Sequence, residues 1–270
     1  MAYRRRNGAV YSVLILVCVV GFWLFENFYT PATYSNNDDS SRANEFPKEL
    51  LPSSTTGEII DHLYFSLSYN EPFEQAEWVA YVLDKKHLTY DDRKRPYFIE
   101  DPFVKSKSAD YINYKGSGYD RGHLVPAGDR RFSLQAYNET FYTSNISPQD
   151  REFNAGIWND LEQQARRWAK KYSPLYVITG GVLEEGLEEI GQEDVDVPDV
   201  FYKIIARKNG NQIETISFLI PNKPQFSPLR NFIVSIDDIE KETGIDFFAE
   251  LPENQQGTFE DSNNTTGWKF

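Results

Sequence analysis

Five segments with β-strand character surround one long helical segment, and this order constrains the fold more than any other feature of the sequence. Residues 62–70 and 76–83 alternate apolar and polar positions and are rich in β-forming side chains. Further strands are predicted over residues 175–183, 201–208 and 213–222, and helices over residues 133–141, 153–171 and 235–243. The last of these helices begins with Ser235 as its cap and Asp238 three residues on. Strands and helices do not alternate regularly, so the sequence predicts the α+β class rather than a repeated β–α–β fold.

Length and composition favour a globular chain with a sizeable core. The chain has 270 residues, of which 40% are hydrophobic and 15% aromatic, and this is too apolar for a wholly disordered protein. Its single cysteine excludes an internal disulfide framework and a CxxC zinc site. We interpret that residue, Cys18, as an apolar filler of the run in which it lies.

The charge balance counts against one class of function. Lys and Arg number 28 and Asp and Glu number 41, which gives a formal net charge of -13. A module that binds nucleic acid only by neutralising phosphates is expected to be basic. The balance therefore disfavours a plain nucleic-acid-binding module, but it is compatible with an enzyme that has one local basic groove.

The N-terminus differs in kind from the rest of the chain. Arg4 to Arg6 precede an uncharged, apolar run over residues 9–25. At about 1.5 Å per residue this run gives a helix of about 25 Å, close to the ~30 Å hydrocarbon core of a bilayer. We expect a cytoplasmic basic stub over residues 1–8 and a single-pass transmembrane signal anchor over residues 9–25, with the remainder periplasmic or extracellular. A cleaved signal peptide, which would give a secreted protein, and a buried core helix are the alternatives.

Composition also divides residues 26–270 into three segments. Residues 26–57 are rich in Ser, Thr, Asn, Asp and Pro and are predicted to be a polar linker. Residues 58–255 carry the periodic segments and form the predicted folded domain. Residues 256–270 are predicted to be a polar, frayed tail.

Chemically active side chains gather in a glycine-rich stretch. Residues 116–128 contain four glycines, which allow tight turns and the close approach of a ligand, around Asp120, Arg121, Gly122 and His123. A lone histidine is more often a satisfied core or surface residue than a catalyst. The adjacent arginine and glycines make His123 the histidine of interest.

A second group lies on the long predicted helix. Asn154, Trp158, Glu162 and Arg166 recur every four residues, and residues at i and i+4 share one face of a helix. An amide, a carboxylate and a guanidinium would then line one stripe. The alternative is a solvated face on which Glu162 and Arg166 form an ordinary surface ion pair.

Together these segments resemble the DNA/RNA non-specific endonuclease family. The resemblance rests on Asp120-Arg121-Gly122-His123, on Ser144 to Gln149 (SNISPQ), and on Asn154 with Trp158, Leu161 and Glu162. It extends from about His62 to Phe248 and so covers the predicted domain but neither the apolar run nor the linker. The resemblance implies a ββα-metal endonuclease fold with a central mixed or antiparallel sheet flanked by helices.

The resemblance also implies roles for single residues. His123, as a neutral imidazole, is implied to be the general base that accepts a proton from the attacking water. Asn154 is implied to be the direct ligand of one Mg²⁺ ion, with Mn²⁺ as an alternative ion. Glu162 is implied to act through water, as the acceptor that holds metal-bound waters.

The remaining implied roles concern phosphate binding and positioning. Arg121 and Arg166 can offer planar guanidinium groups to phosphate oxygens. Asn145 resembles the family asparagine that helps to position the histidine loop or the phosphate. Asp120 and Gly122 are implied to fix the conformation of that loop.

These expectations combine into one function and two alternatives. The favoured function is a membrane-tethered, Mg²⁺-dependent endonuclease that hydrolyses phosphodiester bonds of DNA and RNA without sequence preference, because none of its site residues reads a base edge. The alternatives are a catalytically silent nucleic-acid-binding relative and an anchored interaction protein whose acidic surface meets a protein partner. The sequence leaves the oligomeric state undetermined.

Overall fold

The computed structural model describes residues 10–21, 45–210, 212–252, 256, 260 and 265–270. The chain comprises two compact units, Met1–Tyr34 and Ser35–Phe270. In the first unit a helix covers residues 10–21 and its apolar side chains are exposed. Within the described ranges, no helix is both long and apolar enough to cross a membrane. Residues 9 and 22–25 of the predicted anchor lie outside the described residues, as do residues 26–44 of the predicted linker.

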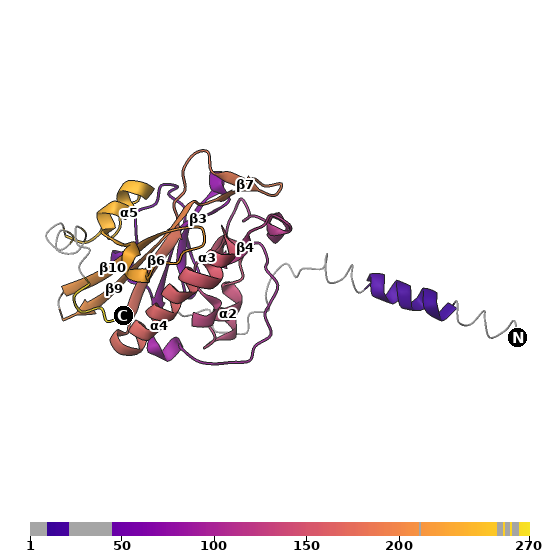
Figure 1. Cartoon of the computed structure of the whole chain (residues 1–270), viewed down its shortest axis with the longest axis horizontal. Coiled ribbons are helices and arrows are strands. Elements are labelled where there is room, and N and C mark those ends of the chain that lie inside the picture. The colour runs from indigo at the N-terminus through magenta and orange to yellow at the C-terminus, as the bar shows by residue number, and fades with distance from the viewer. Residues whose placement is uncertain (1–9, 22–44, 211, 253–255, 257–259, 261–264) are drawn as a thin grey trace, which may run out of the picture. The chain divides into compact units, whose positions relative to one another are not determined.

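A seven-stranded antiparallel sheet is the frame of the second unit (Figure 1). Its order is β1-β2-β3-β6-β9-β10-β11, and every neighbouring pair is antiparallel. The strands are β1 (Ile59–Asp61), β2 (Ser66–Asn70), β3 (Gln75–Leu83), β6 (Leu175–Gly181), β9 (Val200–Asn209), β10 (Gln212–Pro221) and β11 (Ile233–Val234). The five predicted strands coincide with β2, β3, β6, β9 and β10, since alternation of apolar side chains is a local signal.

Both faces of the sheet are covered. Alternate residues of a strand point to opposite faces, and in β3 Val79 and Tyr81 belong to one core cluster while Trp78 and Ala80 belong to the other. The first cluster includes Trp158, Leu161, Ala165 and Trp168, so α4 (Asn159–Tyr172) packs on that face. Figure 1 shows α4 lying across the sheet, with α2 (Leu134–Glu139) beside it. The opposite face is packed by α5 (Ile236–Thr243), which begins with the predicted Ser235–Asp238 cap.

A small hairpin and the helix that follows it form a ββα unit. Strand β4 (Asp120–His123) pairs with β5 (Ile146–Gln149), and α3 (Arg151–Phe153) starts two residues later behind the N-cap Asp150. The predicted helix over residues 153–171 is therefore interrupted: α3 continues through a π-helical segment, η7 (Asn154–Trp158), into α4.

Short elements complete the described structure. A second hairpin pairs β7 (Glu188–Ile190) with β8 (Val195–Val197). The 3₁₀ turns are η1 (Lys48–Leu50), η2 (Glu71–Phe73), η3 (Lys85–His87), η4 (Tyr111–Tyr114), η5 (Ala127–Asp129), η6 (Thr143–Asn145) and η8 (Leu229–Phe232).

The predicted domain bounds of 58 and 255 are too narrow, because segments on both sides pack into the same core. Phe46 and Leu50, within the predicted linker, are buried under the α5 face of the sheet. Trp268, within the predicted polar tail, is buried against α4, and its Nε1 donates to the carbonyl oxygen of Thr215 at 3.1 Å. Trp268 thus anchors this segment in the core, while the other five of residues 265–270 are exposed.

Candidate active site

The predicted glycine loop is largely the strand β4 itself. Gly116 and Gly118 have positive φ angles of 79° and 94° in the turn that leads into it. Gly122 lies opposite Ser147 of β5, and a Cβ atom at Gly122 would lie 2.2 Å from the side chain of Gln149. Glycine at position 122 therefore leaves the space that the buried Gln149 side chain occupies beside β4.

His123 sits in an aromatic pocket at the end of β4. Its ring centroid lies 4.9 Å from that of Phe141 and 5.6 Å from that of Phe98, and its Nε2 atom is buried with no hydrogen-bond partner in the described part of the chain. Burial, and then the charges of Arg95 and Arg121, lower the pKa of His123 to about 3. The ring is therefore a neutral imidazole near pH 7, as a proton acceptor must be.

Two exposed guanidinium groups border His123. Arg121 lies over the ring of Phe98 at 4.9 Å, and Arg95 lies over the same ring at 5.1 Å and over that of Phe141 at 5.4 Å. This stacking on aromatic faces leaves the N–H groups available for an anion. The sequence interpretation missed Arg95; the signal available was the cluster Arg93 to Arg95 in an otherwise acidic chain.

Asp120 links the hairpin to the helix through Asn154. The Nδ2 of Asn154 donates to Oδ2 of Asp120 at 3.1 Å, and Arg151 Nε lies 3.6 Å from the other carboxylate oxygen. The hydrogen bond fixes the orientation of the Asn154 amide and leaves its Oδ1 atom free to accept. Asp120 thus holds the hairpin against the helix and does more than fix a loop.

The donor set fits a hard cation that keeps most of its waters. Among the described residues, no group of three or more His, Cys, Asp or Glu side chains could hold a metal ion. A site that needs a full protein cage, as zinc or calcium sites do, is therefore disfavoured here. One oriented amide oxygen with water in the other positions is compatible with Mg²⁺.

Glu162 and Arg166 belong to a largely buried ion network rather than to a solvated helix face. Arg166 Nε lies 2.5 Å from Oδ1 of Asp129, and its Nη2 lies 3.2 Å from Oε2 of Glu162. The side chains of Asp129, Glu162 and Arg166 are 1%, 15% and 17% exposed. Burial raises the pKa of Glu162. Arg166 is bound to two carboxylates through Nε and Nη2, and its predicted contact with phosphate stays a prediction.

Lys203 of β9 also contributes to this network, and the sequence interpretation missed it. It is fully buried, and its Nζ lies 4.5 Å from the centre of the Trp158 ring. In a strand with alternating apolar and polar residues, a lysine is normally assigned to the solvent-exposed face. The sequence pattern therefore did not indicate that Lys203 is buried.

Asn145 is fully buried and holds the turn that follows His123. Its side chain accepts from the amide of Val125 at 2.8 Å and donates to the carbonyl oxygens of Val125 at 3.1 Å and Thr140 at 2.9 Å. These contacts are compatible with the predicted positioning role, and the predicted phosphate contact stays a prediction.

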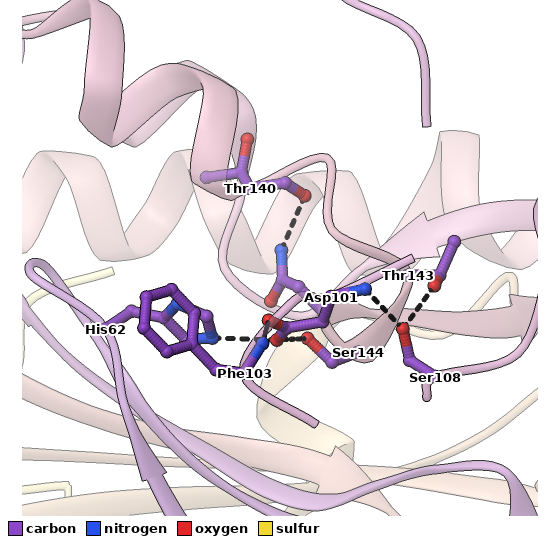
Figure 2. Close-up of polar contacts among 8 residues, drawn as sticks. His62, Asp101, Phe103, Ser108, Thr140, Thr143 and Ser144 are labelled. Atoms are coloured by element: carbon purple, nitrogen blue, oxygen red, sulfur yellow. Dashed lines mark hydrogen bonds and ion pairs between the residues drawn. The ribbon is translucent and has the colours of Figure 1, made fainter. Parts of the chain in front are cut away.

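A second buried network braces the same turn (Figure 2). His62 Nε2 lies 2.8 Å from Oδ2 of Asp101, and Ser144, next to Asn145, donates to the same oxygen. Although burial alone would raise it, the charge of His62 and the surrounding donors lower the pKa of Asp101. Ser, His and Asp here do not form a hydrolase triad, because Ser144 and His62 both bond to the carboxylate and all three are buried.

Comparisons with known proteins show which family this chain is similar to. The family model described as DNA/RNA non-specific endonuclease matches residues 42–254. The chain is 36% identical over 206 residues to "Nuclease EXOG, mitochondrial" of Danio rerio, covering 70% of this chain and 60% of that protein. It is 36% identical over 202 residues to "Endonuclease G, mitochondrial" of Homo sapiens, covering 69% of this chain and 68% of that protein.

A solved structure has the same fold. The crystal structure of the EndoG/EndoGI complex, which concerns EndoG inhibition, matches with a TM-score of 0.67 and 31% identity over 73% of this chain and 88% of that one. The chain spans about 60% of the length of the EXOG relative. The family match confirms the resemblance drawn from the motifs, and the structural match supports the ββα-metal fold.

The predicted localisation is wrong. The sequence was expected to give a single-pass membrane protein with an extracytoplasmic catalytic domain. The relatives are instead named as mitochondrial nucleases, and the part of the chain that the structure describes contains no helix able to cross a membrane. The three arginines before an apolar run suggested an anchor; the structure describes residues 10–21 of that run, and its residues 9 and 22–25 lie outside the described residues.

Proposed function

Because the chain belongs to the DNA/RNA non-specific endonuclease family, we propose that it is a Mg²⁺-dependent endonuclease that hydrolyses phosphodiester bonds of DNA and RNA without sequence preference. The observation that carries this proposal is the ββα unit, in which β4 ends in a neutral His123 and begins with Asp120, which orients the amide of Asn154. A proton acceptor and a metal-binding oxygen are thus carried by one rigid unit.

Each side chain has a defined task in this proposal. His123 accepts the proton of the water that attacks phosphorus. Arg95 and Arg121 bind the phosphate oxygens beside it. Asn154 Oδ1 would hold the metal, and Glu162 would accept hydrogen bonds from metal-bound waters. When bound, the metal stabilises charge on the phosphate and on the leaving oxygen.

Substrate range follows from the same residues. Guanidinium, imidazole and amide groups at this site address the phosphodiester backbone, which DNA and RNA share. The proposed catalytic region extends over residues 45–270, because the segments at both ends of it pack into the core. Experiments are therefore designed for the full chain.

Cleavage of plasmid DNA and of a structureless RNA by the full chain, with Mg²⁺ and then with excess EDTA, tests the proposal. We expect Mg²⁺-dependent cleavage of both substrates that EDTA abolishes, and partial recovery with Mn²⁺. His123→Ala should remove most turnover, by about 10²-fold or more, because general-base catalysis typically contributes 10² to 10⁴.

Binding in EDTA separates the alternatives. A catalytically silent relative would retard labelled DNA in a gel without ever cleaving it. An interaction protein would do neither. Either result would refute the proposed endonuclease.

A further inference from the structure

Lys203 is a buried cation with no hydrogen-bond partner. It lies in the middle of β9, opposite Thr179 of β6 and Phe218 of β10, and its side chain is 0% exposed. Its Nζ makes no hydrogen bond within the described residues. An unpaired ammonium group in a protein interior is strongly unfavourable unless nearby charges compensate it.

The compensating charge is on α4. Phe201 and Ile205, which share the face of Lys203 on β9, belong to the core beneath α4. The Lys203 Nζ lies over the ring of Trp158, and Glu162 is one helical turn beyond Trp158 on the same face. Burial lowers the pKa of Lys203, and the negative charge of Glu162 is the strongest influence that opposes this shift.

Two carboxylates share one guanidinium in this cluster. Asp129 and Glu162 are both bound by Arg166. Arg130, buried beside Asp129, adds a positive charge near that carboxylate. Lys203 is the second positive charge near Glu162, after that of Arg166.

We propose that Lys203 is a positioning residue for the metal site of the proposed endonuclease. Arg166 Nη2 donates to Oε2 of Glu162 at 3.2 Å, and the charge of Lys203 also attracts this carboxylate. The two cations would together hold Glu162 in place to accept hydrogen bonds from the waters of an ion bound at Asn154. Lys203 itself, being fully buried, touches neither metal nor substrate. This inference rests on the proposed function.

Replacement by a neutral side chain of similar length tests it. If Lys203 only fills the core, Lys203→Met should leave metal binding unchanged, since apolar replacements of buried charges are often neutral or stabilising. If it positions Glu162, Lys203→Met should weaken Mn²⁺ affinity about 10-fold or more and lower kcat, with KM for DNA nearly unchanged. Lys203→Arg, which keeps the charge, should recover part of the loss.

The measurements are calorimetric Mn²⁺ binding by the full chain without nucleic acid, kcat and KM with Mg²⁺, and the denaturant midpoint of unfolding. Lys208→Met is the matched control, since Lys208 lies on the same strand but is exposed. Wild-type Mn²⁺ affinity in folded Lys203→Met would overturn the inference.

A double variant covers the case in which Lys203→Met does not fold. Lys203→Met with Glu162→Gln removes both charges, and its Mn²⁺ affinity should equal that of Glu162→Gln alone. A further loss in the double variant would overturn the inference. If the wild-type chain itself shows no metal-dependent cleavage, the proposed function fails; if the wild-type chain cleaves and Lys203→Met binds Mn²⁺ normally, only the role of Lys203 fails.

Discussion

His123 shows how the surroundings of one residue set its chemistry. A histidine in water titrates near pH 6.5, so the activity of a histidine base ordinarily falls on the acid side of that titration. In the structure the ring is packed between Phe98 and Phe141, with two guanidinium groups nearby, and its pKa is lowered to about 3. The acid limit set by His123 in the free protein therefore moves well below its ordinary position.

The pH profile of the free enzyme tests this shift. Because kcat/KM reports groups of the free enzyme, we expect no loss with an apparent pKa of 6 to 7 that can be assigned to His123. The lowered pKa also makes the free energy of unfolding depend on pH. Between pH 6.5 and about 3 the unfolded chain binds a proton at His123 that the folded chain does not. Lowering the pH through this window therefore favours unfolding. The midpoint of urea unfolding of His123→Gln should depend less on pH there than that of the wild type; identical dependence would refute the shift.

At the scale of elements, the π-helical segment gives Asn154 and Glu162 different protein partners, although a regular helix would place them in one stripe. The sequence predicted one helix with Asn154, Trp158, Glu162 and Arg166 in a single stripe. In the structure Gly156 leaves helical geometry, with φ −99° and ψ −109°. Asn154 turns toward Asp120 of the hairpin, while Glu162 and Arg166 remain on α4 and join the buried network. Such π-segments are frequent at functional sites.

Gly156→Ala tests the purpose of this interruption. A Cβ atom at Gly156 would meet nothing within 4 Å, so no clash is introduced. Alanine favours a regular α-helix over glycine by about 1 kcal/mol, and its Cβ disfavours the observed ψ. We expect stability to change by no more than about 1 kcal/mol while Mn²⁺ affinity and kcat fall, because Asn154 loses its alignment with Asp120. Unchanged metal affinity in calorimetry would show that the interruption has no role at the site.

Arg166 and its neighbour Arg167 give a matched pair on α4. Removing Arg166 leaves Asp129 and Glu162 without the cation that both carboxylates bind. Breaking a buried pair in this way typically costs about 3–5 kcal/mol. Arg167 is exposed and bonds only to Gln164 within the described residues, so Arg167→Ala should cost less than about 1 kcal/mol. Urea unfolding of Arg166→Ala and Arg167→Ala measures the two losses of stability. Equal losses would mean that Glu162 and Arg166 form only an ordinary surface ion pair.

At the scale of the whole molecule, what the sequence could predict was local. The strands β2, β3, β6, β9 and β10 and the cap of α5 follow from alternation and from one capping pattern, which depend only on near neighbours. The motifs gave the residues of the ββα unit for the same reason.

The missed features are all tertiary. Lys203 is buried because α4 covers its strand, Trp268 because the C-terminal segment returns to α4, and Arg95 borders His123 because of a long connection that brings Phe98 there. No periodicity within a short window encodes these contacts.

Electrostatics also depends on the whole molecule. The chain has a net charge of -13, and yet the surface beside His123 presents the two exposed guanidinium groups of Arg95 and Arg121. A polyanion is therefore attracted at one place and repelled elsewhere. This arrangement predicts weak general affinity for nucleic acid and few phosphate contacts.

The salt dependence of DNA binding measures the number of phosphate contacts directly. Each phosphate neutralised in duplex DNA contributes about −0.9 to the slope of log K against log salt concentration. With two exposed arginines at the site, we expect a slope of about −2, far smaller than that of a basic DNA-binding protein. Binding of His123→Ala to a labelled duplex in EDTA, where cleavage cannot occur, gives this slope. Adding Arg121→Ala should reduce its magnitude by about one, since one phosphate contact is lost, whereas adding Lys208→Ala at the far end of β9 should leave it unchanged. A slope that Arg121→Ala does not alter would mean that the phosphate backbone is held elsewhere on the molecule, and the cationic surface beside His123 would then have no part in substrate binding.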